Sequence, residues 1–118
     1  MSFSEVLKEL TEGVPGSKGA AVVGMDGIIV EELAAEPGVD MQSVGAEYGN
    51  LLKGAQAASR SLQIGRTEEI SIAAERAWLV MRKINDDYFI ALLLSPESNL
   101  GKGRFLLRIA ANKLIKEF

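Results

Sequence analysis

The stretch Tyr88–Leu94 constrains the fold of this chain more than any other. Its residues carry no charge and are apolar at both alternating positions. A strand with one face in water alternates apolar and polar residues, so this pattern predicts a strand that is buried on both faces. Turn residues bound it, with Asn85–Asp87 before it and Ser95–Pro96 after it, and so short a run favours a strand over a helix. We therefore expect a sheet with helices on both faces and this strand in its middle.

Composition excludes several kinds of site. The chain has 118 residues, which suits one domain spanning residues 1–118. It has no cysteine and no histidine, so disulfides, thiolate nucleophiles and the commonest general base and metal ligand are absent. Its net charge of −3 gives the whole molecule no attraction to nucleic acid or to an anionic membrane. We expect no enzyme, no catalytic residue, no cofactor and no metal.

The N-terminus gives no sign of export. Met1–Glu5 lacks the basic segment and the long apolar core of a signal peptide, and no apolar run is long enough to span a bilayer. The cytoplasm is the expected compartment.

The first part of the chain predicts a helix and a hairpin. Ser2 and Glu5 have capping-box spacing, and the helix that they begin should end at Gly13. Two apolar runs follow, Lys18–Met25 and Ile28–Val30, and the Asp-Gly pair between them predicts a tight turn.

A long helix should come next, capped by Asp40 and running to about Gln63. Its apolar residues form one stripe, made of Val44, Tyr48, Leu51, Leu52, Ala55, Ala58 and Leu62. Gly45 and Gly49 lie four apart on a flank of this stripe, and each costs the helix about 1 kcal/mol relative to alanine. They indicate either a tolerated weakness or close approach by a second helix or a partner. Their shared flank favours close approach.

The remaining elements complete the fold. Alternation predicts a third strand over Glu69–Glu75 and a fourth over Ala77–Ile84, and a basic helix should run from about Leu100 to Glu117. Pairing the two most apolar strands gives an α/β (α+β) fold, α-β-β-α-β-β-β-α, with an antiparallel five-stranded sheet of order 2-1-5-4-3. The first and last helices, one acidic and one basic, should share one face, and the long second helix should cover the other.

Gly101–Gly103 invites a phosphate-loop interpretation, which fails. Such a loop needs serine or threonine after the lysine and a glycine five positions before Gly101, and this chain has Gly103 and Pro96 there. A solvated basic helix face is favoured over an anion site. Tyr48 and Trp78 are better explained as packing residues than as platforms for bases.

The element order, the Gly24–Gly27 hairpin turn and the Asn99–Arg104 segment between an apolar strand and the last helix resemble the Roadblock/LC7 family. The resemblance covers about Val6 to Ile115 and is strongest to the MglB type. The dynein light-chain branch and the lysosomal scaffold branch of the family remain alternatives. The fold that the resemblance implies is profilin-like.

The resemblance also implies a dimer, in which the third strands pair across a two-fold axis and the two long helices lie together. A homodimer is the main expectation, and a heterodimer is the alternative. An exposed edge strand and a helix notched by glycines agree with this expectation. The predicted interface consists of Gly45, Gly49, Ile70, Ser71, Ile72, Ala73 and Ala74.

By the same resemblance, the chain is a non-enzymatic regulator of a small Ras-like GTPase of the MglA type. As an MglB-type GTPase-activating protein it would reshape the GTPase rather than insert an arginine. The predicted contacts lie off the apolar stripe of the long helix: Lys53, Gln56, Ala57 and Arg60. A structural adaptor without effect on hydrolysis is the alternative. A small-ligand sensor is a third possibility, for which the sequence shows no polar pocket.

Overall fold

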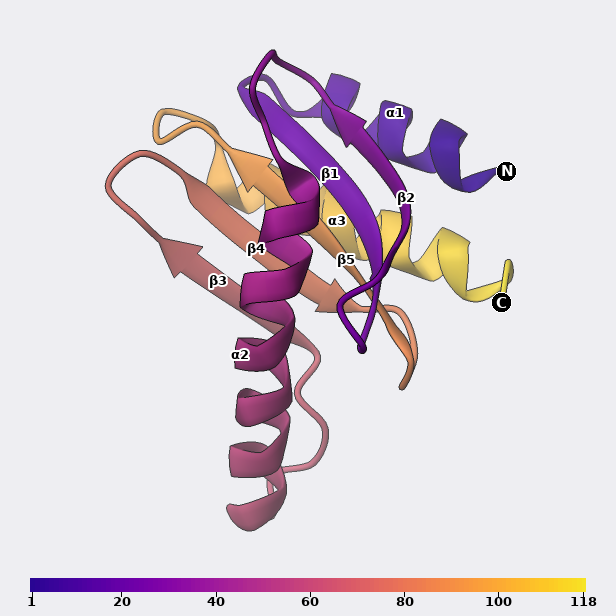
Figure 1. Ribbon diagram of the computed structural model, residues 1–118, viewed down its shortest axis with the longest axis vertical. Coiled ribbons are helices and arrows are strands. Elements are labelled where there is room, and N and C mark those ends of the chain that lie inside the picture. Colours follow the sequence, from indigo (N-terminus) through magenta and orange to yellow (C-terminus); the bar gives the residue numbers. More distant parts are fainter.

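The protein is built on a sheet with helices on both faces (Figure 1). The computed structural model describes residues 1–118. The elements follow the predicted order: α1 (Phe3–Gly13), β1 (Ser17–Gly24), β2 (Ile29–Ala34), α2 (Met41–Ser61), β3 (Glu69–Ala73), β4 (Trp78–Lys83), β5 (Tyr88–Leu94) and α3 (Leu100–Ile115). The strand order β2-β1-β5-β4-β3 and the antiparallel pairing are confirmed.

β5 is the central strand, as its sequence predicts. It pairs with β1 on one side and with β4 on the other, and Phe89–Leu92 are completely buried. Ile90 and Leu92 face the core under α1 and α3, whereas Phe89 and Ala91 face the core under α2. One short strand therefore supplies side chains to both layers.

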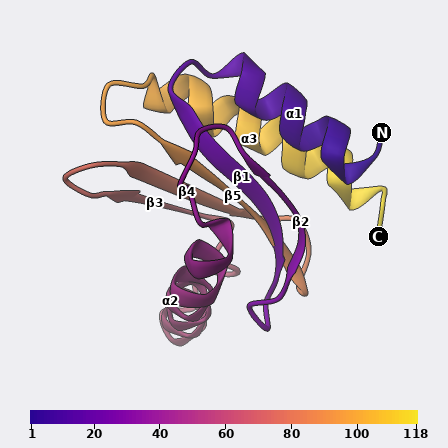
Figure 2. The same ribbon diagram turned by 45° about the horizontal axis from the view of Figure 1, so that its top comes forward.

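The helices divide as expected, with α1 and α3 side by side on one face of the sheet and α2 on the other (Figure 2). Opposite charges meet between the paired helices, where Lys113 Nζ lies 3.2 Å from Glu9 Oε2. None of the three helices is both long and apolar enough to cross a membrane.

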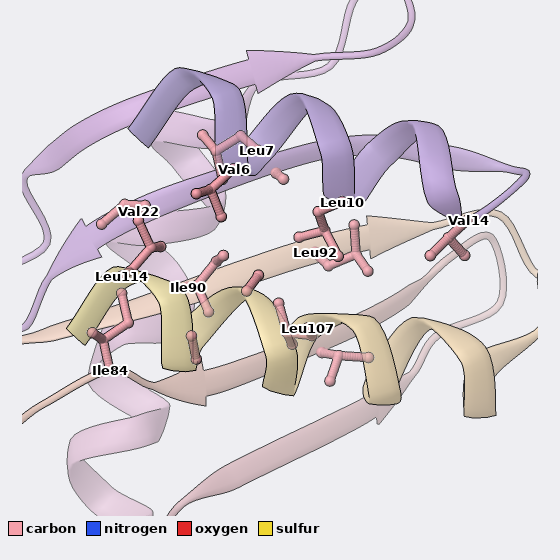
Figure 3. Close-up of a cluster of buried hydrophobic side chains, with 14 of the residues drawn as sticks. Val6, Leu7, Leu10, Val14, Val22, Ile84, Ile90, Leu92, Leu107 and Leu114 are labelled. Carbon is pink, nitrogen blue, oxygen red and sulfur yellow. The ribbon is translucent and has the colours of Figure 1, made fainter. Parts of the chain in front are cut away.

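The two layers are unequally packed. Fifteen buried residues form the core under α1 and α3, in which Leu7 and Leu10 of α1 meet Leu107 and Leu114 of α3 (Figure 3). The core under α2 has eight. The α1–α3 layer therefore contributes most of the buried apolar surface, and the α2 layer is left with surface that the monomer does not cover.

Side-chain caps begin the helices at the predicted positions. Ser2 Oγ accepts a hydrogen bond from the Glu5 N–H, and Asn99 Oδ1 accepts one from the Lys102 N–H. Asp40 Oδ1 accepts from the N–H groups of Gln42 and Ser43. Hydrogen bonds from the Ser43 side chain and backbone lower the pKa of Asp40. Ionised Asp40 thus stabilises the start of α2 at neutral pH, and this contribution is lost as the pH falls through the lowered pKa.

β2 differs from its prediction. It covers Ile29–Ala34 rather than Ile28–Val30, and its register against β1 shifts between Val22 and Val23. The shift is a β-bulge, and it places Ile29 against the α2 core but Leu33 against the opposite core. A simple two-residue alternation would put these two residues on one face, so the pattern conceals the second half of the strand.

Two other elements end earlier than predicted. α2 stops at Ser61, because Gln63 adopts a left-handed φ of 58° and the Ile64 N–H turns back to the Ser59 carbonyl. β3 stops at Ala73, because the Ala74 N–H closes the turn by donating to the Ala77 carbonyl at 2.9 Å.

Two glycines of α2 give a matched stability test. A Cβ on Gly54 would meet no atom within 4 Å, whereas one on Gly45 would lie 3.0 Å from Val23 Cγ1. Gly54→Ala should stabilise the protein by about 1 kcal/mol through helix propensity. Gly45→Ala should destabilise it by roughly 1–3 kcal/mol through overpacking. Denaturant unfolding at one fixed protein concentration measures both, and equal shifts for the two variants would contradict this packing of α2.

Candidate interaction surface

β3 leaves one edge of the sheet open, since it pairs only with β4. Two hydrogen bonds of 2.9 Å define which backbone groups face β4: Lys83 N–H to Glu68 C=O, and Ala74 N–H to Ala77 C=O. Antiparallel strands alternate their bonded pairs every second residue, so Ile70 and Ile72 also direct their backbone groups toward β4. The N–H and C=O groups of Glu69, Ser71 and Ala73 therefore point outward and have no strand partner.

The side chains of β3 alternate between the two layers. Ile70 and Ile72 are half-buried and pack against the core under α2, whereas Ser71 and Ala73 are exposed. Glu69 fixes the start of the strand, because its carboxylate accepts from Arg104 Nε at 2.7 Å and from Arg82 Nη1 at 3.3 Å. The edge is thus held in a defined position by α3 and β4.

The other edge of the sheet is less suited to pairing. β2 is interrupted by its bulge and carries the adjacent carboxylates of Glu31 and Glu32. Bulges and charges are devices that keep an edge strand from adding another strand. β3 pairs with β4 in an uninterrupted register and has no such bulge, so it is the edge better suited to a partner strand.

α2 packs on the sheet only through its first half. Its buried residues are Met41, Gly45, Gly49 and Leu52, and none follows Leu52. The helix lies mainly over β1 and β2, and its last turns extend past the end of the sheet (Figure 1). The second half of α2 is therefore a projecting surface rather than part of the core.

Gly45 and Gly49 lie on the inner side of α2. A Cβ on Gly45 would lie 3.0 Å from Val23 Cγ1 of β1, and one on Gly49 would lie 3.8 Å from Phe89 Cζ of β5. Close approach at these glycines is correct, but the chain's own sheet makes it. The prediction that a second helix approaches there is corrected, because both residues are buried within the monomer.

The apolar stripe of α2 is rotated away from the face that meets the sheet. Of its members, only Leu52 is buried, whereas Leu51 is 49% exposed and Leu62 is 69% exposed. Ile64, in the connection to β3, is 71% exposed. Together with the β3 edge these residues form what we call the α2–β3 surface, consisting of Leu51, Leu62, Ile64, Ser71 and Ala73.

The residues predicted to contact a GTPase do not share one environment. Lys53, Ala57 and Arg60 are exposed on α2. Gln56 is half-buried, and its amide nitrogen is enclosed without a hydrogen-bond partner. Helical spacing places Lys53 and Ala57 on the flank of α2 opposite Leu51 and Leu62.

Lys53 lines a groove of about 200 Å³ between α2 and the turn that joins β1 to β2. Ala46 and Asn50 line the same groove from the helix, and Ile28, which is 67% exposed, lines it from the turn. Ile28 was expected inside a strand, so alternation gave no sign of its exposure. Its position directly after the Asp-Gly turn is the signal that could have indicated it.

The surface carries no set of side chains suited to covalent or metal chemistry. No group of three histidine, cysteine, aspartate or glutamate side chains is placed to hold a metal ion. What it offers is backbone pairing, exposed apolar area and isolated cations, which are the components of a protein–protein interface.

Comparisons with known proteins agree with this architecture. The Roadblock/LC7 domain pattern matches residues 3–94. The crystal structure of MglC from Myxococcus xanthus is 35% identical over 100% of both chains, with a TM-score of 0.72. No curated protein sequence matched the chain.

MglB structures share the fold at lower identity. MglB of Thermus thermophilus is 19% identical over 97% of this chain and 86% of its own, with a TM-score of 0.87. MglB of M. xanthus is 15% identical over 98% and 94%, with a TM-score of 0.88. The pattern match over most of the sequence and the 35% identity to MglC establish the family: this chain belongs to the Roadblock/LC7 family.

Proposed function

We propose that the protein is a non-enzymatic homodimer that regulates a small Ras-like GTPase, as a GTPase-activating protein of the MglB type. The observation that carries this proposal is the α2–β3 surface, where a straight, unpaired strand edge adjoins apolar side chains that the monomer leaves exposed. Family membership and the structural likeness to MglB support the choice of partner.

In the proposed dimer, two β3 strands pair across a two-fold axis and make one continuous sheet. The outward backbone groups of Ser71 and Ala73 then gain partners, and an isologous contact of this kind closes on itself. Leu51 and Leu62 would be covered by the second α2, at roughly 25 cal/mol per Å² of apolar surface removed from water. Ile70, Ile72 and Ala74 flank the pairing without leading it, since their backbone groups face β4.

The GTPase would contact the opposite flank of α2. Lys53, Ala57 and Arg60 stay accessible when Leu51 and Leu62 are covered, because helical spacing places the two groups on different sides. Ile28 adds an exposed apolar side chain beside Lys53. A cation, a small residue and an apolar residue around a shallow groove suit a transient interface. Gln56 contributes less, since its side chain is half-buried.

A regulator without catalytic groups can raise GTP turnover in one way. It must bind the hydrolysis-competent conformation of the GTPase more tightly than the other conformations, and the gain is limited by that difference in affinity. A rigid helix flank held on a sheet is suited to such selection, because it does not adapt equally to both conformations.

A dimeric adaptor without effect on hydrolysis is the second candidate. The observation that favours it is that the structure of higher identity is MglC rather than MglB. The same α2–β3 surface would form the dimer, so only the effect on GTP turnover separates the two candidates.

Dimerisation through β3 is tested by Ser71→Pro. The Ser71 N–H points away from β4, so proline there removes an outward donor and leaves the β3–β4 bonds in place. We expect the wild type to be a dimer and the variant a folded monomer, as measured by light scattering and circular dichroism. Ser71→Val keeps the N–H and should remain dimeric. A wild type that is monomeric at micromolar concentration would refute the dimer.

GTPase regulation is tested by Ala57→Arg. A large cation at this exposed, small position should block docking by steric clash, with little cost to the helix. GTP turnover of an MglA-type GTPase should rise with the wild type and stay at its basal rate with the variant. Ala35→Arg, the same change in the loop before α2, should act like the wild type. Binding with unchanged turnover would favour the adaptor, and a wild type that binds no GTPase would exclude both candidates.

A further inference from the structure

α3 carries a one-sided charge on the face of the sheet opposite the α2–β3 surface (Figure 2). Between Leu100 and Ile115 it has four cationic residues and no acidic one: Lys102, Arg104, Arg108 and Lys113. Arg104 is engaged with Glu69 and Lys113 with Glu9, whereas no carboxylate pairs with Lys102 or Arg108. The chain as a whole is acidic, so this helix is a local positive surface on a negative protein.

An aromatic ring stands exposed among these cations. Phe105 is 52% exposed, and the Arg108 guanidinium carbon lies 5.7 Å from its ring centroid. The cation–π contact holds both side chains in place without burying either. An exposed, oriented pair of arginine and phenylalanine has the composition of an interface anchor, since aromatic residues and arginine are enriched at protein interfaces.

Beside this pair an apolar groove of about 180 Å³ runs between α1 and α3. Val6 and Leu10 line it from α1, and Leu106 and Ile109 line it from α3. The Glu9–Lys113 ion pair crosses it with both side chains well exposed, so it adds little stability and can open. A carboxylate from elsewhere could replace Glu9 at Lys113 and give access to the apolar floor.

We propose that this groove and the cationic ridge of α3, formed by Lys102, Phe105 and Arg108, bind an acidic amphipathic helix of a partner protein. Its apolar residues would lie in the groove, and its carboxylates would meet the unpaired cations, as in the recognition of an amphipathic helix by a groove. The docking site lies across the sheet from the proposed dimer and GTPase contacts, so it does not depend on them.

The neighbouring helix argues against an anionic membrane as the occupant. Glu5, Glu9 and Glu12 are exposed along α1, next to the basic ridge. A flat anionic bilayer would have to cover both helices and would be repelled by α1. A single helix is narrow enough to follow α3 alone, with its acidic side turned away from α1.

The test uses a fluorescent synthetic peptide of about 20 residues, made of glutamate and alanine with leucine at helical spacing. Its control has lysine in place of every glutamate. Fluorescence anisotropy with the full chain should show saturable binding of the acidic peptide only, weakened about tenfold by raised salt. Vesicles containing phosphatidylserine should not bind in sedimentation.

Variants locate the site. Arg108→Glu and Phe105→Ala change exposed side chains and should weaken peptide binding by about tenfold or more while the melting temperature is kept. Lys53→Glu makes the same charge change on the other face of the sheet and should bind the peptide like the wild type. Equal losses for Lys53→Glu and Arg108→Glu would show only general electrostatic attraction and overturn the proposal.

Three other outcomes would also overturn it. These are no binding of the acidic peptide, equal binding of both peptides, and binding of vesicles without binding of peptide. If light scattering shows a larger assembly that Arg108→Glu dissolves, the ridge binds a second copy instead. The Ser71→Pro and Ala57→Arg results bear on the other face of the sheet, so the two proposals can fail separately.

Discussion

The whole structure depends on the burial of β5 between two strands and two helical layers. Its alternate side chains belong to separate cores, Ile90 and Leu92 to one and Phe89 and Ala91 to the other. A polar residue at any of these positions would be buried without a partner, so both layers constrain this one strand. The hairpin on one side of β5 and the meander on the other follow from that position.

The unequal packing of the two layers separates stability from interaction. α1 and α3 pack against each other and against the sheet, and their core is the larger. α2 approaches the sheet through Gly45 and Gly49 and then extends beyond it, so apolar side chains such as Leu62 stay in water. Exposed apolar area of this kind is unfavourable in a monomer and useful at an interface.

The two sheet edges show the same division. β2 combines a bulge with two neighbouring glutamates, which discourages strand addition. β3 is straight and is anchored by Glu69 between Arg82 and Arg104. A strand held in place yet unpaired on one side is organised for backbone pairing, since little further ordering is needed when a partner arrives.

The sequence by itself determined the features that depend on local chemistry. The caps at Ser2, Asp40 and Asn99, the Asp-Gly turn and the doubly buried β5 each follow from neighbouring residues, and together they predict the element and strand order. The tertiary structure decided which side of α2 is covered, because periodicity shows that an apolar stripe exists but not what packs on it. It also decided that the notch at Gly45 receives the chain's own sheet, and that a bulge extends β2, because both depend on contacts between residues distant in sequence.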